Sequence, residues 1–153
     1  MSLTIYKSSI LTTSIDIADM GEGLTTGTRR IESDGRQYVL LFTGEDLPNG
    51  EMCTLDAAEA TETVLHVDIA GVNDGPLGCN NTGSEVVENK FFWAIVHGIG
   101  YARYAATLGA VGLALECAAI GEVGILTSQA DFRLGYGLET GTDSNLGAVY
   151  FTL

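Results

Sequence analysis

Short apolar runs closed by glycine dominate residues 91–128, and this pattern is typical of strands joined by tight turns. Residues 91–96 form an aromatic and β-branched run that glycines at 98 and 100 close. Residues 112–117 alternate loosely, and residues 123–126 form a second short apolar run after a small-residue turn. The sequence therefore predicts that this stretch organises a sheet.

The alanine- and leucine-rich part of this stretch, residues 101–120, also fits a helix, because both residue types favour helical structure. Gly109 and Gly112 interrupt it, and each costs about 1 kcal/mol relative to alanine inside a helix. Strand and turn is therefore the preferred interpretation, with a helix as the alternative.

The clearest local signal is a hairpin over residues 29–42. Two apolar or mixed runs, 29–32 and 36–42, flank the pair Asp34-Gly35. An Asp-Gly pair supplies the positive φ angles of a type I′ turn, so we expect that turn here.

The rest of the chain predicts further short strands and one long polar loop. The expected strands cover 52–55, 63–70, 132–138 and 148–153, with one helical turn at 57–62 and an exposed loop at 71–89. Eight to ten short strands indicate a mainly β fold, a compact β-barrel or sandwich. No internal repeat is visible.

Residues 1–20 are rich in serine, threonine and isoleucine and contain no helix signal. We interpret them as an extended N-terminal arm that pairs with a neighbour, because terminal segments are ordered only when they are tied down. A first strand of the chain's own sheet is the alternative. Residues 21–153 are expected to form a single β domain.

Composition favours burial against partners. Hydrophobic residues make up 46% of the 153 residues and charged residues only 18%, below the usual share of about 25%. Such a chain commonly hides surface in a homo-oligomer or larger assembly, although a well-packed sheet protein with a polar uncharged surface gives the same numbers. The net charge of −13 argues against nucleic acid and anionic membranes as partners.

The three cysteines, Cys53, Cys79 and Cys117, include no CxxC pair, so they predict buried free thiols, not a zinc site. Free thiols indicate synthesis in a reducing cytoplasm. The first 13 residues lack the apolar core of a signal peptide, and no run approaches the length of a transmembrane helix.

No catalytic motif is present, so we expect no enzyme, no catalytic residues and no cofactor. His66 and His97, the two histidines, lie in or at the end of predicted strands and are interpreted as structural. The glycine pair at 98 and 100 resembles part of a dinucleotide loop, but turn glycines explain it better. Arg29, Arg30 and Arg36 are expected to be solvated or paired with local acids.

Oxygen-bearing side chains also crowd one region of the chain, which makes calcium an alternative. Their spacing fits no EF-hand, and polar loops use the same residues to form turns, so no metal site is predicted. The residues are Asp68, Asn73, Asp74, Asn80, Asn81 and Glu85.

The order of these segments resembles the decoration, or cement, proteins of tailed bacteriophage heads. The resemblance rests on "GTRRIESDGRQYVLLFTGEDLPNGEM", "FFWAIVHG" and "GLALECAAIGEVGILTS", and covers residues 27–51 and 91–128. The shared features are structural glycines, the hairpin and Trp93, which is expected to be a core anchor.

The resemblance implies a structural protein on the outer surface of a capsid, bound to the major capsid protein and to itself, most simply as a homotrimer. Many weakly bound copies across capsomer seams would then stabilise the shell together. Its location would be the virion. Two alternatives remain: a phage tail or fibre module that binds a host-surface ligand, and a small enzyme whose site forms only in space.

Overall fold

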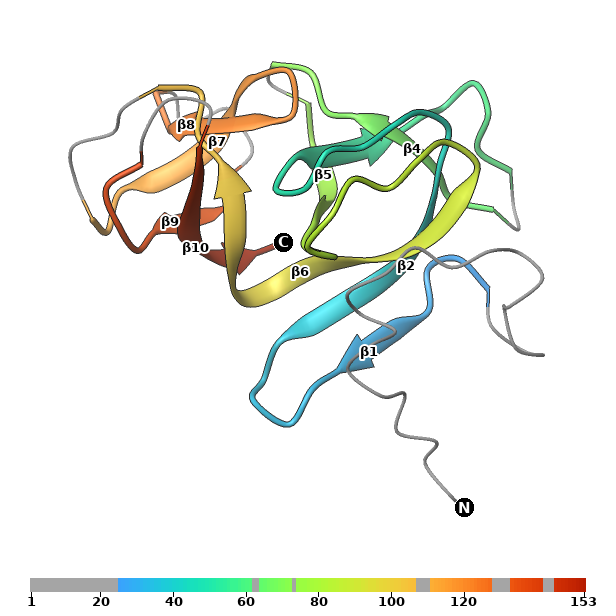
Figure 1. Ribbon diagram of the computed structural model, residues 1–153, viewed down its shortest axis with the longest axis horizontal. Coiled ribbons are helices and arrows are strands. Elements are labelled where there is room, and N and C mark those ends of the chain that lie inside the picture. Colours follow the sequence, from blue (N-terminus) through green and yellow to red (C-terminus); the bar gives the residue numbers. More distant parts are fainter. Residues whose placement is uncertain (1–24, 62–63, 73, 107–110, 128–132, 142–144) are drawn as a thin grey trace.

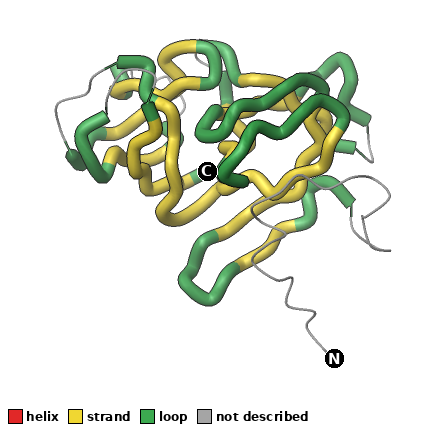
Figure 2. The backbone as a smooth tube through the Cα atoms, in the orientation of Figure 1, coloured by secondary structure: helices red, strands yellow, loops and turns green. Residues whose placement is uncertain are grey.

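The computed structural model describes residues 25–61, 64–72, 74–106, 111–127, 133–141 and 145–153. The expected N-terminal arm lies outside these residues. Strands and loops make up all of the described chain, which contains no helix (Figure 2). The ten strands are β1 (Arg29–Ile31), β2 (Gln37–Thr43), β3 (Met52–Leu55), β4 (His66–Ile69), β5 (Pro76–Asn80), β6 (Lys90–Arg103), β7 (Ala114–Ala119), β8 (Glu122–Ile125), β9 (Gly135–Gly137) and β10 (Leu146–Thr152).

Five strands close into a barrel in the order β2, β4, β3, β5, β6, with β6 pairing back onto β2. The β2–β4 pair is parallel and the other pairs are antiparallel. The strand β1 adds to β2 as a hairpin that stands away from the barrel (Figure 1). The predicted mainly β, barrel-like fold is confirmed.

The remaining strands form a second lobe on the C-terminal half of β6, in the order β10, β9, β7, β8. A single bridge joins Tyr104, directly after β6, to Val123 in β8, so this lobe also returns to its starting strand. Figure 1 shows that the two lobes share β6, which bends sharply between them. The helix considered for residues 101–120 is absent from the described part of that segment, where β7 begins at Ala114.

The strand β6 was expected to end at its glycines, and this is wrong: it runs for 14 residues through both of them. Gly98 has a φ of +92°, which lets the strand turn from β2 to β10. A β-carbon at Gly100 would lie 3.0 Å from Cε2 of Phe151, so that glycine makes room for a core ring. Neither glycine lies in a loop of the dinucleotide-binding kind.

Side chains of β6 alternate between two cores. Phe91, Trp93 and Ile95 pack into a cluster that connects the barrel strands to β7, β8 and β10. The intervening side chains, including Phe92, pack with residues of β2, β3 and β4 in the second cluster. Trp93 is 1% exposed, which confirms it as a core anchor. Burial on both faces explains why this strand is a nearly continuous apolar run.

The β1–β2 hairpin is confirmed, but its turn type is not. Gly35 has a φ of +89°, whereas Asp34 is not among the positive-φ residues. The Gly35 N–H donates to the Glu32 carbonyl at 3.0 Å, and the Glu32 N–H donates to the Arg36 carbonyl at 2.8 Å. This is a type I turn with a glycine bulge, which the right-handed strand twist tolerates as well as a type I′ turn.

The exposed loop expected at 71–89 is also wrong, because β5 occupies its centre and pairs with β3 and β6. Asn80 is fully buried, and its side-chain amide donates to the carbonyls of Leu47 and Ser84 at 2.8 and 2.9 Å. These bonds satisfy a polar group that composition alone assigns to the surface. At 57–62 the Ala60 N–H donates to the Asp56 carbonyl at 2.9 Å, which forms a single turn. The described residues include no helix that is long and apolar enough to span a membrane.

Candidate functional site

An open hollow of about 490 Å³ lies where the β1–β2 hairpin meets the bend of β6 and the strand β10. Its lining mixes aromatic and aliphatic side chains with one acidic and one basic residue. The principal lining residues are Asp34, Arg36, His97, Ile99, Tyr101 and Tyr150.

Strand alternation explains why large side chains face outward here. Beyond the bend, Ile99 and Tyr101 are 57% and 55% exposed, while Gly100 and Ala102 between and after them are buried. Tyr150 lies directly opposite Ile99 on β10 and is 36% exposed. The outer surface of the β6–β10 pair is therefore apolar and aromatic, whereas a solvent-exposed sheet face ordinarily carries polar side chains.

Tyr101 is fixed through its backbone, not through its ring. The side-chain amide of Asn81 donates to the Tyr101 carbonyl, and the Tyr101 N–H donates to the Asn81 side-chain oxygen, both at 2.7 Å. Asn81 thus replaces a neighbouring strand at this point of β6. The sequence made Asn81 a candidate calcium ligand, and these bonds give it a structural role.

The rim of the hollow is charged. Arg36 lies over Gly98, and its Nε donates to the Asp34 carboxylate at 2.7 Å. A hydrogen bond from the Arg36 backbone N–H lowers the pKa of Asp34, with the Arg36 side chain adding to the effect. Arg30 forms a similar local pair with Glu32 at 2.8 Å. The interpretation of Arg30 and Arg36 as paired with local acids is confirmed.

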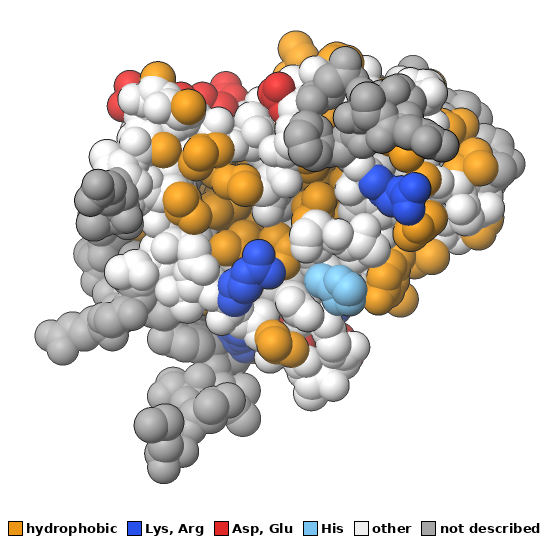
Figure 3. All heavy atoms as spheres, turned by 180° about the vertical axis from the view of Figure 1, so that it is seen from behind, with side chains coloured by type: hydrophobic (Ala, Val, Ile, Leu, Met, Phe, Trp, Pro, Cys, Tyr) orange, Lys and Arg blue, Asp and Glu red, His pale blue; other side chains and the backbone are white. Residues whose placement is uncertain are grey.

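The same surface continues onto β9. Tyr136 pairs with Tyr150, and the guanidinium of Arg133 lies 5.6 Å from the centre of the Tyr136 ring. We call Ile99, Tyr101, Tyr136 and Tyr150 the aromatic face. In the view of Figure 3, hydrophobic side chains spread over the face, with a histidine and Lys or Arg side chains among them. Most of the visible Asp and Glu side chains lie along the upper edge. Tyrosine and arginine at such density are typical of protein interfaces.

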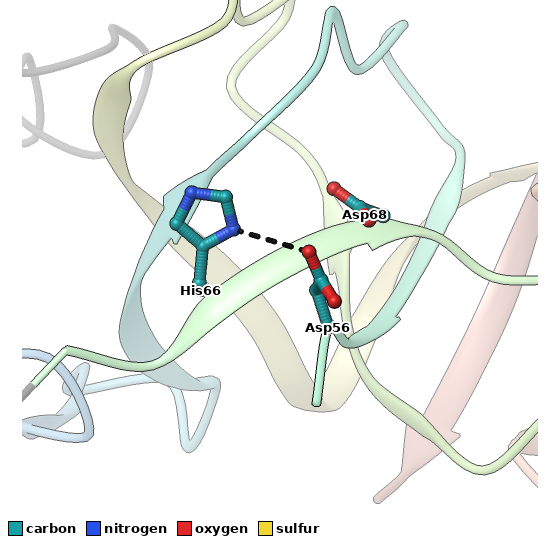
Figure 4. Close-up of side chains that lie close together, drawn as sticks. All are labelled: Asp56, His66 and Asp68. Carbon is teal, nitrogen blue, oxygen red and sulfur yellow. Dashed lines mark ion pairs between the residues drawn. The ribbon is translucent and has the colours of Figure 1, made fainter. Parts of the chain in front are cut away.

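A second group of functional side chains lies on the barrel wall, where Asp56, His66 and Asp68 converge (Figure 4). One ligand atom of each lies within 4.8 Å of the others. Nδ1 of His66 is 3.8 Å from the Asp56 carboxylate, and it is buried without a hydrogen-bond partner. His66 is therefore in the expected strand but is not the satisfied structural histidine that the sequence indicated.

Burial raises the pKa of Asp68, and the neighbouring charges of Asp56 and Glu45 raise it further. The sequence grouped Asp68 with loop residues that the structure uses differently. Asp74 accepts a hydrogen bond from the Gly71 N–H at 2.7 Å, and Asn80 is held in the core. Asn73 lies outside the described residues. The sequence missed Asp56, which lies ten residues before its histidine partner.

The three cysteines are buried and unpaired, as expected. Burial raises the pKa of Cys53 and of Cys117 to about 12, and that of Cys79 well above its ordinary value. Thiols in this state are poor nucleophiles and poor metal ligands. His97, the other histidine, has its Nε2 atom 3.2 Å from the Tyr150 hydroxyl in the hollow.

The architecture defines an all-β protein built on a closed five-stranded barrel. No family model matches the chain, and no curated protein matches it. Among solved structures it is similar to the N base of the head fibre gp8.5 of bacteriophage phi29, with a TM-score of 0.60 and 10% sequence identity. The match covers 75% of this chain and 92% of that chain, and at this identity it establishes a common fold.

Proposed function

We propose that this chain is a structural protein of a bacteriophage head that sits on the outer surface of the capsid. The observation that carries the proposal is the fold shared with a head-fibre base over 92% of that base. The segment order that resembles head decoration proteins points in the same direction. This role requires a docking surface and no catalytic group.

The aromatic face and its hollow supply a surface suited to that role. Tyrosine buries a large area at low cost in side-chain entropy and keeps a hydroxyl for hydrogen bonding. Arg36 and Arg133 place guanidinium donors on this surface of a chain whose net charge is −13, with the charge of Arg36 balanced by Asp34. We propose that the major capsid protein covers this face and contributes acceptors to the two arginines.

The sequence resemblance favours a decoration protein that stabilises the shell, and the structural likeness favours the base that anchors a fibre. Both roles place the chain in the virion, with capsid and self contacts, most simply as a trimer. They differ in copy number, since decoration proteins occupy many equivalent positions on a shell.

The test uses capsids of the phage that encodes this chain, prepared without it. Purified protein is mixed with these capsids, sedimented and quantified per particle, and the complex is imaged by cryo-electron microscopy. Saturable binding at symmetry-defined positions is expected. Absence of binding to capsids, with binding to host cells instead, would contradict the proposal and favour a receptor-binding module.

A further inference from the structure

The pairing of β3 with β4 gathers Asp56, His66 and Asp68 on the barrel wall. Thr54 lies opposite Asp68, and the Asp56 N–H, just beyond β3, donates to the His66 carbonyl at 3.0 Å. His66 and Asp68 are two residues apart on one strand, so their side chains share a face. Figure 4 shows the three side chains directed toward a common point above β4.

The imidazole is held in place while one of its nitrogens has no hydrogen-bond partner. Phe42 contacts the ring at a centroid distance of 5.1 Å, and a β-carbon at Gly44 would collide with its Cε1 atom. Nδ1 is buried, faces the Asp56 carboxylate at 3.8 Å and makes no hydrogen bond. A buried ring nitrogen without a partner is costly, and a metal ion is one of the few partners that satisfies it.

The negative charges around this nitrogen also require compensation. Asp56 and Asp68 each place a carboxylate oxygen within 4.8 Å of the other and of a ring nitrogen of His66. Glu45, which accepts from the Ile69 N–H at 2.7 Å, is not one of the three converging residues. Oδ1 of Asp56 accepts from the Ala58 N–H at 2.9 Å, and its Oδ2 faces Nδ1 of His66. A divalent cation between them would neutralise both carboxylates and occupy the free lone pair of Nδ1.

The donor set selects the ion. One imidazole nitrogen and two carboxylate oxygens suit Zn²⁺ or Mn²⁺, whereas Ca²⁺ and Mg²⁺ prefer oxygen ligands. Donors around an ion at about 2.1 Å can be at most about 4.2 Å apart. The observed separations, within 4.8 Å, therefore need only a small rotation of an aspartate side chain.

We propose that Asp56, His66 and Asp68 form a binding site for one divalent transition-metal ion. Three protein ligands leave the remaining positions to water. The ion would join the end of β3 to the start of β4 and so stabilise the barrel near the parallel β2–β4 pair. This site is separate from the aromatic face and does not depend on the proposed head location.

The test measures Zn²⁺ and Mn²⁺ binding to the full chain, freed of any histidine tag and of metal by chelation. Calorimetry should give one site, and metal at about 100 times the dissociation constant should raise the melting temperature by about 5 °C or more. Asp68→Asn and His66→Gln should each weaken binding at least tenfold. His97→Gln removes the other histidine and should leave binding unchanged.

A second measurement does not depend on the variants. In NMR spectra of the unmodified protein, metal should shift the imidazole resonances of one histidine and leave those of the His97 ring, bonded to Tyr150, in place. Three results would overturn the proposal: no binding at 1 mM metal, undiminished binding in a folded Asp68→Asn variant, or imidazole resonances that do not respond.

Discussion

The Tyr150 hydroxyl lies 3.2 Å from Nε2 of His97, and the two rings meet edge to face at 5.5 Å and 73°. His97 stands at the bend of β6 and Tyr150 on β10, so this contact fixes the floor of the hollow across two strands. A preorganised aromatic surface loses little side-chain entropy when a partner covers it.

Tyr101→Ser should weaken capsid binding at least tenfold, because truncating a tyrosine at the centre of an interface costs about 2 kcal/mol of binding free energy. The side chain is 55% exposed, so the melting temperature should change little. Val72→Ser is the matched control, since Val72 is also 55% exposed but belongs neither to the aromatic face nor to the lining of the hollow. Equal binding of both variants in quantitative co-sedimentation would exclude this face as the docking surface.

Gly98→Ala should destabilise the protein by about 3 kcal/mol. An alanine would be strained at a φ of +92°, which costs about 1 to 2 kcal/mol. Its β-carbon would also lie 3.0 Å from Cγ and 3.1 Å from Cα of Arg36, and overpacking adds about 1 kcal/mol or more.

Gly83→Ala separates these two contributions. Gly83 has a φ of +89°, and a β-carbon added there would have nothing within 4 Å, so only the backbone strain should appear. Chemical denaturation of both variants measures the difference. Equal free energies of unfolding would show that Arg36 yields without cost.

Asp68→Asn should raise the melting temperature of the metal-free protein at pH 7. The pKa of Asp68 in the folded chain is raised above its ordinary 3.8, chiefly by burial, so the folded state holds this proton more tightly than the unfolded state. Ionisation therefore removes stability as the pH rises through the folded pKa. The gain from asparagine should vanish below about pH 3.8.

Asp34→Asn provides a control of opposite sign. The pKa of Asp34 is lowered by the Arg36 backbone N–H, so its stabilising charge is present above pH 3.8 and disappears as the pH falls through the lowered value. Melting temperatures should be measured from pH 3 to 8. Toward pH 7, Asp68→Asn should melt above the unmodified protein and Asp34→Asn slightly below it. Parallel curves would contradict both assignments.

The thiols should resist alkylation until the chain unfolds. Cys53 has a pKa of about 12 and is fully buried, so roughly one molecule in 10,000 carries its thiolate at pH 8. Iodoacetamide followed by mass spectrometry should label all three cysteines in guanidinium and none in buffer. Rapid labelling of Cys53 in buffer would show that the barrel opens readily.

Sedimentation of the purified chain tests self-association. The expected trimer has three times the 16.1 kDa mass of the chain. Exposed Ile31 on β1 and Ile125 on β8, the two end strands of the sheet order, are available for contacts between copies. A single species of chain mass at micromolar concentration would contradict the trimer.

Local chemistry determined much of the fold from the sequence. Asp34 and Gly35 between two strand-like runs were sufficient to place the first hairpin, since turn residues act through their own backbone angles. The aromatic run containing Trp93 identified the central strand, because a strand buried on both faces has no polar side to interrupt it. The unpaired, buried state of the cysteines also followed from their spacing.

Long-range pairing decided the rest. Gly98 and Gly100 look like the end of a strand, and only the partners β2 and β10 on successive parts of β6 show that the strand continues. Asn80 in β5 can be buried because its side-chain amide reaches the Leu47 carbonyl, 33 residues away in the sequence. Asp56 and His66 meet through the register of β3 and β4, and Tyr150 meets His97 across 53 residues. Such contacts depend on which strands pair, and no local propensity encodes that choice.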